Sequence, residues 1–187
     1  MDAQELLDRY AAGERNFRDT DLFRADLNGA DISGASLFRC NLFGANLFRT
    51  KMVGVNLFRA TLIHANLSHT NLSGADLSGA NLSGANLSGA DLSGADLSDA
   101  DLGGVDLTGA CLNYADLTNA YLFRAYLVDA SLSNANFKGA RLKGTNFNGA
   151  IVKEANFTNA TGLSENLKIE LMQQGAIFDL SPLATIS

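Results

Sequence analysis

The sequence is poor in the residues from which most catalytic and metal sites are built. Its 187 residues include only two histidines and two cysteines. It has no inward cluster of charged residues and no glycine loop of the phosphate-binding type. Metal-dependent and nucleophilic catalysis therefore have few candidate groups to use. We predict that the chain is not an enzyme and has no cofactor and no metal site.

Long apolar runs and a secretion signal are also missing. No stretch approaches the roughly 18 apolar residues of a membrane span. The N-terminus has no basic stretch followed by an apolar segment, as a signal peptide would. Two cysteines make no disulfide framework, which fits a reducing compartment. We expect a cytoplasmic protein that makes no contact with a membrane.

What the sequence does contain is a strict five-residue repeat. From Phe17 to Phe157 every fifth residue is apolar, at twenty-nine positions without an insertion, and the unit reads Ala-(Asp/Asn)-Leu-x-x. At about 100° per residue, a helix would place successive leucines roughly 140° apart. A flat strand would point them to alternate faces. Only a chain that turns once per unit keeps Ala and Leu inward, so the pattern predicts an all-β solenoid.

The residue pattern leaves the number of units per coil open. Rare residues recur at a spacing of twenty, as Phe38 and Phe58 do, and also at fifteen, as Phe23 and Phe38 do. The A(D/N)Lxx register of residues 17–160, clearest from Ala75 to Ala100, resembles the pentapeptide repeat family. The resemblance implies a right-handed quadrilateral β-helix with four units per coil, and thus about seven coils here. The opening segment 6–17 is similar to cyanobacterial members, including ones linked to heterocyst control.

Both ends depart from the repeat, and we divide the chain accordingly. Residues 1–13 predict an N-terminal cap helix with Asp2 near its start and Gly13 as its stop. Residues 14–160 are predicted to form the β-helix. Residues 161–187 predict a C-terminal cap helix over 165–174 and a tail. We expect the apolar residues of the tail to seal the last coil: Ala176, Ile177, Phe178, Leu180 and Leu183. The alternative, implied by the family resemblance, is a homodimer through this end.

Outward positions near the N-terminus carry phenylalanine and arginine, whereas those in the middle are mostly serine and glycine. Exposed aromatic and arginine residues are typical of protein interfaces. We therefore predict that an unidentified protein partner binds Phe23, Arg24, Phe38, Arg39, Phe43, Phe48, Arg49, Phe58 and Arg59. The competing interpretation is structural, with the arginine stems lying along the rings and shielding the backbone.

Charge is uneven along the chain. Residues 60–123 carry seven aspartates and no basic residue, against a net charge of −6 overall. With twenty residues per coil, Asp76, Asp96 and Asp116 form an acidic ladder. Because the family resemblance implies DNA-like ligands or inhibitors of DNA gyrase, DNA mimicry through this ladder is an alternative function. A structural spacer is a further alternative. Direct nucleic-acid binding is not expected, since a basic stripe is lacking.

Overall fold

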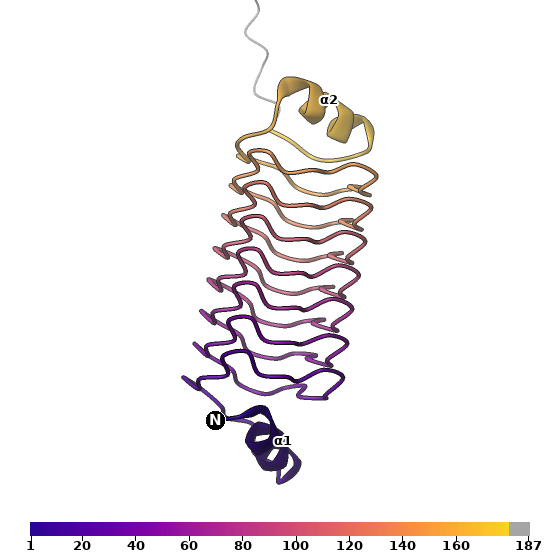
Figure 1. Cartoon of the computed structure of the whole chain (residues 1–187). Coiled ribbons are helices and arrows are strands. Elements are labelled where there is room, and N and C mark those ends of the chain that lie inside the picture. Colours follow the sequence, from indigo (N-terminus) through magenta and orange to yellow (C-terminus); the bar gives the residue numbers. More distant parts are fainter. Residues whose placement is uncertain (180–187) are drawn as a thin grey trace, which may run out of the picture.

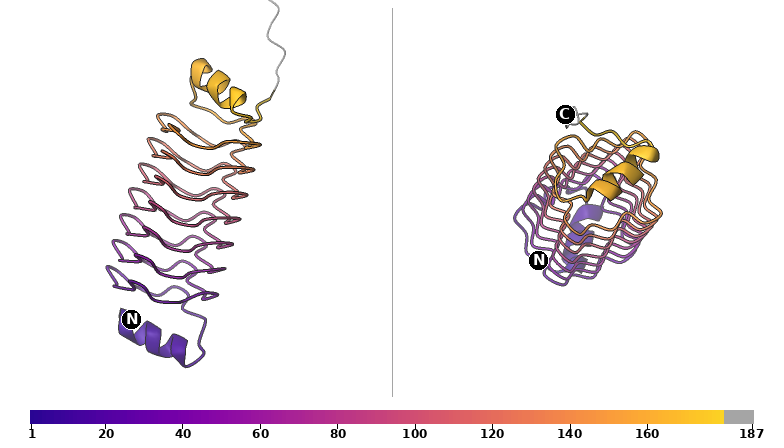
Figure 2. Two further views of the ribbon diagram at one scale, coloured as in Figure 1. Left: turned by 90° about the vertical axis from the view of Figure 1, so that its right-hand side faces the viewer. Right: turned by 90° about the horizontal axis from the view of Figure 1, so that it is seen from above.

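The computed structural model describes residues 1–179, which form a rod of stacked coils with one helix at each end (Figure 1). Helix α1 (Ala3–Ala11) lies at the N-terminal end and helix α2 (Glu165–Gln173) at the C-terminal end. Seen along the rod, the coils superpose into a single column (Figure 2). Each outward residue can therefore be located by its coil along the rod and by the side of the column on which it lies.

Parallel β-bridges join residues twenty apart, from Asn16↔Ser36 to Arg141↔Thr161. Four pentapeptides thus complete one coil, and a coil of fifteen residues is excluded. At this spacing residues 16–161 amount to about seven coils. Each bridge ladder runs along one side of the column. We number the sides 1 to 4 after the ladders that begin at Asn16, Asp21, Asp26 and Asp31.

The repeat gives a hydrogen-bond acceptor to each of the five amide groups of a typical unit. Three of the N–H groups donate to neighbouring coils, one closes the turn, and one bonds to the Asp or Asn side chain of its own unit. In one unit these bonds run from Asn41 to Thr20 (3.0 Å), Leu42 to Thr61 (2.7 Å), Phe43 to the Asn41 side chain (3.2 Å), Gly44 to Ile63 (2.9 Å) and Ala45 to Leu42 (3.0 Å). Such complete pairing is what a backbone near a buried core requires.

The Asp/Asn row, at positions 16, 21 and onward to 156, supplies the fifth of these acceptors. Twenty of its twenty-nine members are Asp or Asn, and every one of the twenty accepts the N–H two residues later at 2.9–3.5 Å. These are the local side-chain turns that short polar residues favour. The row therefore has a structural role before any functional one.

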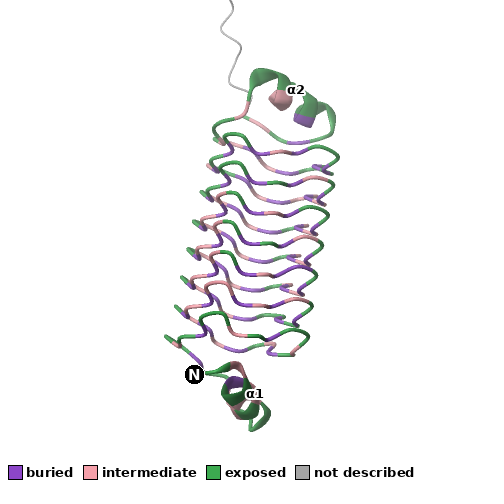
Figure 3. Cartoon of the chain, in the orientation of Figure 1, coloured by how far each residue is buried: buried purple, intermediate pink, exposed green. Residues whose placement is uncertain are grey.

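The core is a narrow column of leucine and alanine. The structure buries every residue of the leucine row, at positions 17 to 157, and most of the alanine row (Figure 3). Three threonines that replace alanine remain buried and donate to a carbonyl of the preceding coil: Thr50, Thr70 and Thr145. Thr50 bonds to Leu27 at 2.8 Å, and Thr70 bonds to Leu47 at 2.6 Å. Such hydrogen bonds offset the cost of placing a hydroxyl in the core.

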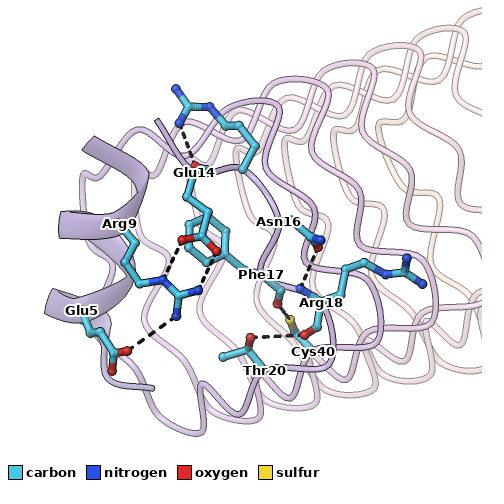
Figure 4. A network of polar contacts seen from close by, with 9 residues as sticks. Glu5, Arg9, Glu14, Asn16, Phe17, Arg18, Thr20 and Cys40 are labelled. Atoms are coloured by element: carbon cyan, nitrogen blue, oxygen red, sulfur yellow. Dashed lines mark hydrogen bonds and ion pairs between the residues drawn. The ribbon is translucent and has the colours of Figure 1, made fainter. Parts of the chain in front are cut away.

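Helix α1 covers the first coil through both apolar and charged contacts (Figure 4). The Asp2 carboxylate accepts the Glu5 N–H at 2.8 Å, as an N-cap does, and Leu6 is fully buried. The Arg9 guanidinium lies over the Phe17 ring at 5.7 Å and donates two hydrogen bonds to Glu14. These bonds hold the pKa of the Glu14 carboxyl below its usual value. Apolar core at this end is thus shielded from water.

Helix α2 and the chain after it cover the last coil. Ser164 caps the helix by accepting the Leu167 N–H at 3.3 Å, and Leu171 is buried. Beyond the helix, Phe178 stacks on Phe157 with ring centroids 5.2 Å apart. Ala176 is also buried, whereas Ile177 is half exposed. The remaining predicted sealing residues, Leu180 and Leu183, lie outside the described residues.

Candidate protein-interaction surface

Each unit ends in a two-residue turn whose second residue is left-handed. All twenty-nine residues at this position, from Asp19 to Asn159, have φ between +52° and +75°. Fourteen are glycine and six are Asp or Asn, the residues that tolerate this backbone best. Five are arginine. For a long side chain the left-handed backbone costs about 1 kcal/mol or more, so the local backbone does not explain why arginine recurs there.

A phenylalanine precedes each of these five arginines and its ring contacts the guanidinium. We call this two-residue turn a Phe–Arg pair. Guanidinium-to-centroid distances are 5.2 Å in Phe23–Arg24, 5.9 Å in Phe38–Arg39, 4.9 Å in Phe48–Arg49, 5.0 Å in Phe58–Arg59 and 5.1 Å in Phe123–Arg124. The ring orients the cation and covers part of its stem. The structural interpretation of these residues therefore describes a real contact.

The structure distributes the predicted partner-binding residues over three sides of the rod. Phe38 and Phe58 stack on side 1 with centroids 5.6 Å apart, and Phe23 and Phe43 stack on side 2 at the same distance. Phe48 lies on side 3, with no phenylalanine in the adjacent coils of its column. Two stacks on neighbouring sides are thus brought together, and the pair at Phe48 stands apart from them.

The arginines of the predicted set are exposed, whereas most of its rings are not. Phe23 in the first coil is 53% exposed, whereas the other four phenylalanines of the predicted set are half-buried. Arg39 forms an ion pair with Asp19 at 3.4 Å. The other arginines of the set form no ion pair with any residue of the described chain: Arg24, Arg49 and Arg59. The surface therefore presents unneutralised guanidinium groups beside partly covered aromatic rings.

The two histidines mark where this surface meets the Ser/Gly middle. His64 contacts Phe43 edge-on with centroids 5.8 Å apart, and His69 contacts Phe48 in the same way. They lie on sides 2 and 3 respectively. Within residues 1–179 no group of three or more His, Cys, Asp or Glu is arranged to hold a metal ion. Both imidazoles thus extend the aromatic columns by one coil.

The acidic ladder lies on side 1, where Asp76 bridges Asp96 and Asp96 bridges Asp116. Each carboxylate accepts the N–H two residues later, at 3.0, 2.9 and 2.9 Å respectively. Neighbouring strands lie about 4.8 Å apart, so like charges face each other along this ladder. The three aspartates stabilise their own turns and repel one another.

Asp96→Asn is expected to raise the free energy of unfolding by about 0.5–1 kcal/mol at low salt, because it removes two like-charge contacts. Asparagine keeps the oxygen that accepts the Ser98 N–H. The matched control is Asp91→Asn, since Asp91 makes the same turn bond but its ladder neighbours are Asn71 and Cys111. Urea titrations at low and high salt measure both variants. An equal effect at the two positions would contradict like-charge repulsion.

Both cysteines are free thiols, one buried and one partly exposed. Cys40 is buried in the alanine row and donates to the Phe17 carbonyl at 2.8 Å (Figure 4). Burial raises the pKa of its thiol to about 11, so it remains protonated near neutral pH. Cys111 stands in the Asp/Asn row on another side.

Across the part of the chain that the structure describes, no helix is both long and apolar enough to cross a membrane.

A second group of exposed aromatic residues was not predicted. Tyr121, Phe123 and Tyr126, on sides 2 and 3, are exposed by 43%, 48% and 52% respectively, whereas Tyr114, which is 70% exposed, lies apart from them on side 4. Two sequence signals could have located it. Phe123 begins a fifth Phe–Arg pair, and the two tyrosines at 121 and 126 interrupt the Asp/Asn row.

Comparison with known proteins gives a family match along almost the whole rod. A family profile described as pentapeptide repeats matches in eight copies, within residues 16–39, 40–79, 75–113, 100–139 and 125–161. A search of curated proteins finds no match.

Several solved structures are similar to this chain. A trypsin-treated variant of QnrB1, a plasmid-mediated fluoroquinolone resistance protein, is 20% identical over 88% of this chain and 89% of its own, with a TM-score of 0.61. A second structure is HetL, a pentapeptide repeat protein involved in heterocyst differentiation regulation from Nostoc sp. strain PCC 7120. It is 30% identical over 86% of this chain and 96% of its own, with a TM-score of 0.28. A pentapeptide repeat protein from the Arabidopsis thaliana thylakoid lumen is 29% identical over 81% of this chain and 78% of its own, with a TM-score of 0.36. The likeness to QnrB1 supports the right-handed quadrilateral β-helix that the sequence resemblance implies.

Proposed function

Because the chain belongs to the pentapeptide repeat family, we propose that it is a non-enzymatic scaffold whose N-terminal Phe–Arg pairs bind a protein partner. The main support for the proposal is the left-handed backbone conformation of the arginines. Arg24, Arg49 and Arg59 occupy left-handed turn positions that glycine fills at no steric cost in fourteen other units. They also form no ion pair within the described chain. An external carboxylate or carbonyl would give each guanidinium the partner that it lacks.

The arrangement suits an interface energetically. Arginine and aromatic residues dominate the binding energy of many protein complexes. Here each guanidinium is already oriented over its own ring, so less side-chain freedom is lost on binding. The stacks at Phe23 and Phe38 occupy neighbouring sides of the first coils. A partner that embraces sides 1 and 2 would contact both of them.

Replacing Phe38 and Phe58 together with serine is expected to weaken partner capture at least about ten-fold, because both rings of the side 1 stack are lost. Full-length protein, immobilised and exposed to a cyanobacterial extract, is compared with this variant. The control carries Val53→Ser and Tyr114→Ser, which remove exposed apolar residues from side 4. Circular dichroism verifies that both variants fold. If parent and Phe variant capture the same proteins equally, the proposed surface is wrong.

DNA mimicry through Asp76, Asp96 and Asp116 has weaker support. Duplex DNA presents about one charge per 1.7 Å along its axis, whereas this ladder supplies one carboxylate per coil, about every 4.8 Å. The turn bonds that each aspartate accepts already explain the residue type. Like the spacer function, mimicry therefore remains second to the Phe–Arg surface.

Three finer features complete the proposal. The similarity of residues 6–17 to cyanobacterial members supports a regulatory role in a cyanobacterium. The lack of a disulfide framework supports a cytoplasmic location. On the C-terminal end, the exposed Ile169 and Met172 of α2 support a homodimer through that end. Light scattering over a range of protein concentrations tests the dimer.

A further inference from the structure

A compact group of aromatic and basic side chains lies near the C-terminal end of side 2 and on the adjoining part of side 3. The side 2 ladder runs without a break from Asp21 through Tyr121 to Arg141, so Phe123 stands in the same column as Phe23. We define the C-terminal aromatic patch as Tyr121, Phe123, Arg124, Tyr126 and Arg141. Its three rings are each between two-fifths and just over half exposed. At about 4.8 Å per coil, Phe43 and Phe123 are about 19 Å apart along the rod, which separates the patch from the N-terminal stacks.

Local stability does not account for the residues of this patch. Tyr121 and Tyr126 stand in the Asp/Asn row. All twenty Asp and Asn residues of this row accept a hydrogen bond from a turn N–H, and a tyrosine side chain cannot make that bond. Five of the seven row positions from 121 to 151 lack Asp or Asn, against four of the twenty-one before them. Arg124 is left-handed, with φ of +55°. Adjacent departures from what a fold prefers are typical of functional sites.

The patch is also cationic next to an acidic stretch. Residues 121–143 contain four basic residues and one acidic residue, whereas residues 60–120 contain seven aspartates and no basic residue. The Arg141 guanidinium lies over the Tyr121 ring at 4.2 Å, and that of Arg124 lies over Phe123. Neither arginine forms an ion pair within residues 1–179. Two oriented guanidiniums thus lie among rings, with no carboxylate of their own.

We propose that the C-terminal aromatic patch is a second binding surface, and that it binds an acidic segment of a partner protein. Guanidinium groups bind carboxylates through paired hydrogen bonds, and exposed rings bury the apolar side chains between those carboxylates. A nucleic acid is a poorer fit, because its phosphate charge continues along the whole strand and would meet the seven aspartates of the adjacent coils, whereas a short acidic segment need reach only the patch. This surface does not depend on the N-terminal Phe–Arg pairs.

Fluorescence anisotropy with full-length protein tests the proposal, and the probe is a short labelled peptide of glutamates alternating with leucine and phenylalanine. Arg124→Gly and Arg141→Gln are each expected to weaken binding of this peptide about ten-fold. Arg124→Gly suits the left-handed turn, so folding is preserved. The matched control, Lys51→Gln, removes a positive charge from the same row as Arg141→Gln but on side 4, and is expected to leave the affinity unchanged.

Three outcomes would overturn the proposal. The first is no binding of the acidic peptide by the parent protein. The second is equal weakening by Arg141→Gln and Lys51→Gln, which would indicate charge attraction over the whole rod. The third is tighter binding of an oligo-dT of similar length, which would make the ligand a nucleic acid. Thermal unfolding by circular dichroism shows that each variant is folded when it is tested.

Discussion

Leu92→Asp is expected to abolish cooperative folding. Leu92 lies in the middle of the column and is fully buried among leucines and alanines. Truncating such a leucine costs about 2–5 kcal/mol, and placing an unpaired carboxylate there costs more. A domain of this size has a total stability of about 5–15 kcal/mol. Because each coil contacts only its neighbours, a break in the middle also removes support from the coils on both sides.

Gly94→Asp provides the matched control for Leu92→Asp. It adds the same charge two residues away, at an outward left-handed position where an added Cβ meets nothing within 4 Å. Aspartate already occupies this turn position at Asp99 and Asp129. We expect it to cost less than about 1 kcal/mol. Far-UV circular dichroism and urea titration compare the variants; a cooperative, parent-like transition in Leu92→Asp would refute the inward leucine row.

Gly162→Ala is expected to destabilise the C-terminal end by about 3 kcal/mol. Gly162 has φ of +89°, and an added Cβ would lie 2.5 Å from the Lys143 nitrogen and 2.8 Å from its Cα. The Lys143 backbone cannot move aside as the end of a flexible side chain can. The left-handed conformation contributes about 1 kcal/mol of this cost, and overpacking about 2 kcal/mol. Gly162 precedes α2, so the strain acts where the helix joins the last coil.

Gly74→Ala separates the two contributions for Gly162→Ala. Gly74 has φ of +62°, and an added Cβ there meets nothing within 4 Å. It should therefore show the conformational cost alone, about 1 kcal/mol. Limited proteolysis is expected to release α2 from the Gly162 variant before the coils unfold, since solenoid ends open locally. Equal losses in both variants would mean that the Lys143 backbone gives way without cost.

The fold explains why function must be sought in departures from the repeat. Leucine fills the core, alanine lets the coils pack closely, and Asp or Asn accepts the hydrogen bond of the turn. The structure therefore determines the residue types at these three positions. The two turn positions are free to vary, and the arginines there are unfavourable for the backbone. Substitutions such as Arg59→Gly are therefore expected to separate binding from stability, which few core mutations can do.

The sequence predicted the most where one local rule repeats. A five-residue period with two inward rows permits only a coil, so burial of residues such as Leu92 followed from periodicity. The bond that each Asp or Asn accepts from its turn N–H is of a kind that short polar side chains favour, but the structure was needed to show it. The coil size did not follow, because Phe38 recurs with Phe58 at twenty but with Phe23 at fifteen. Bridges between coils resolve that choice.

The candidate site shows the same division. The sequence alone determined that phenylalanine and arginine share outward turns near the N-terminus, since residue type and slot are both local properties. Only the tertiary structure decided that Phe23 stacks on Phe43, that the pair at Phe48 lies on a third side, and that most of these rings are half-buried. Exposure and stacking depend on which residue lies one coil away, which is a property of the coil.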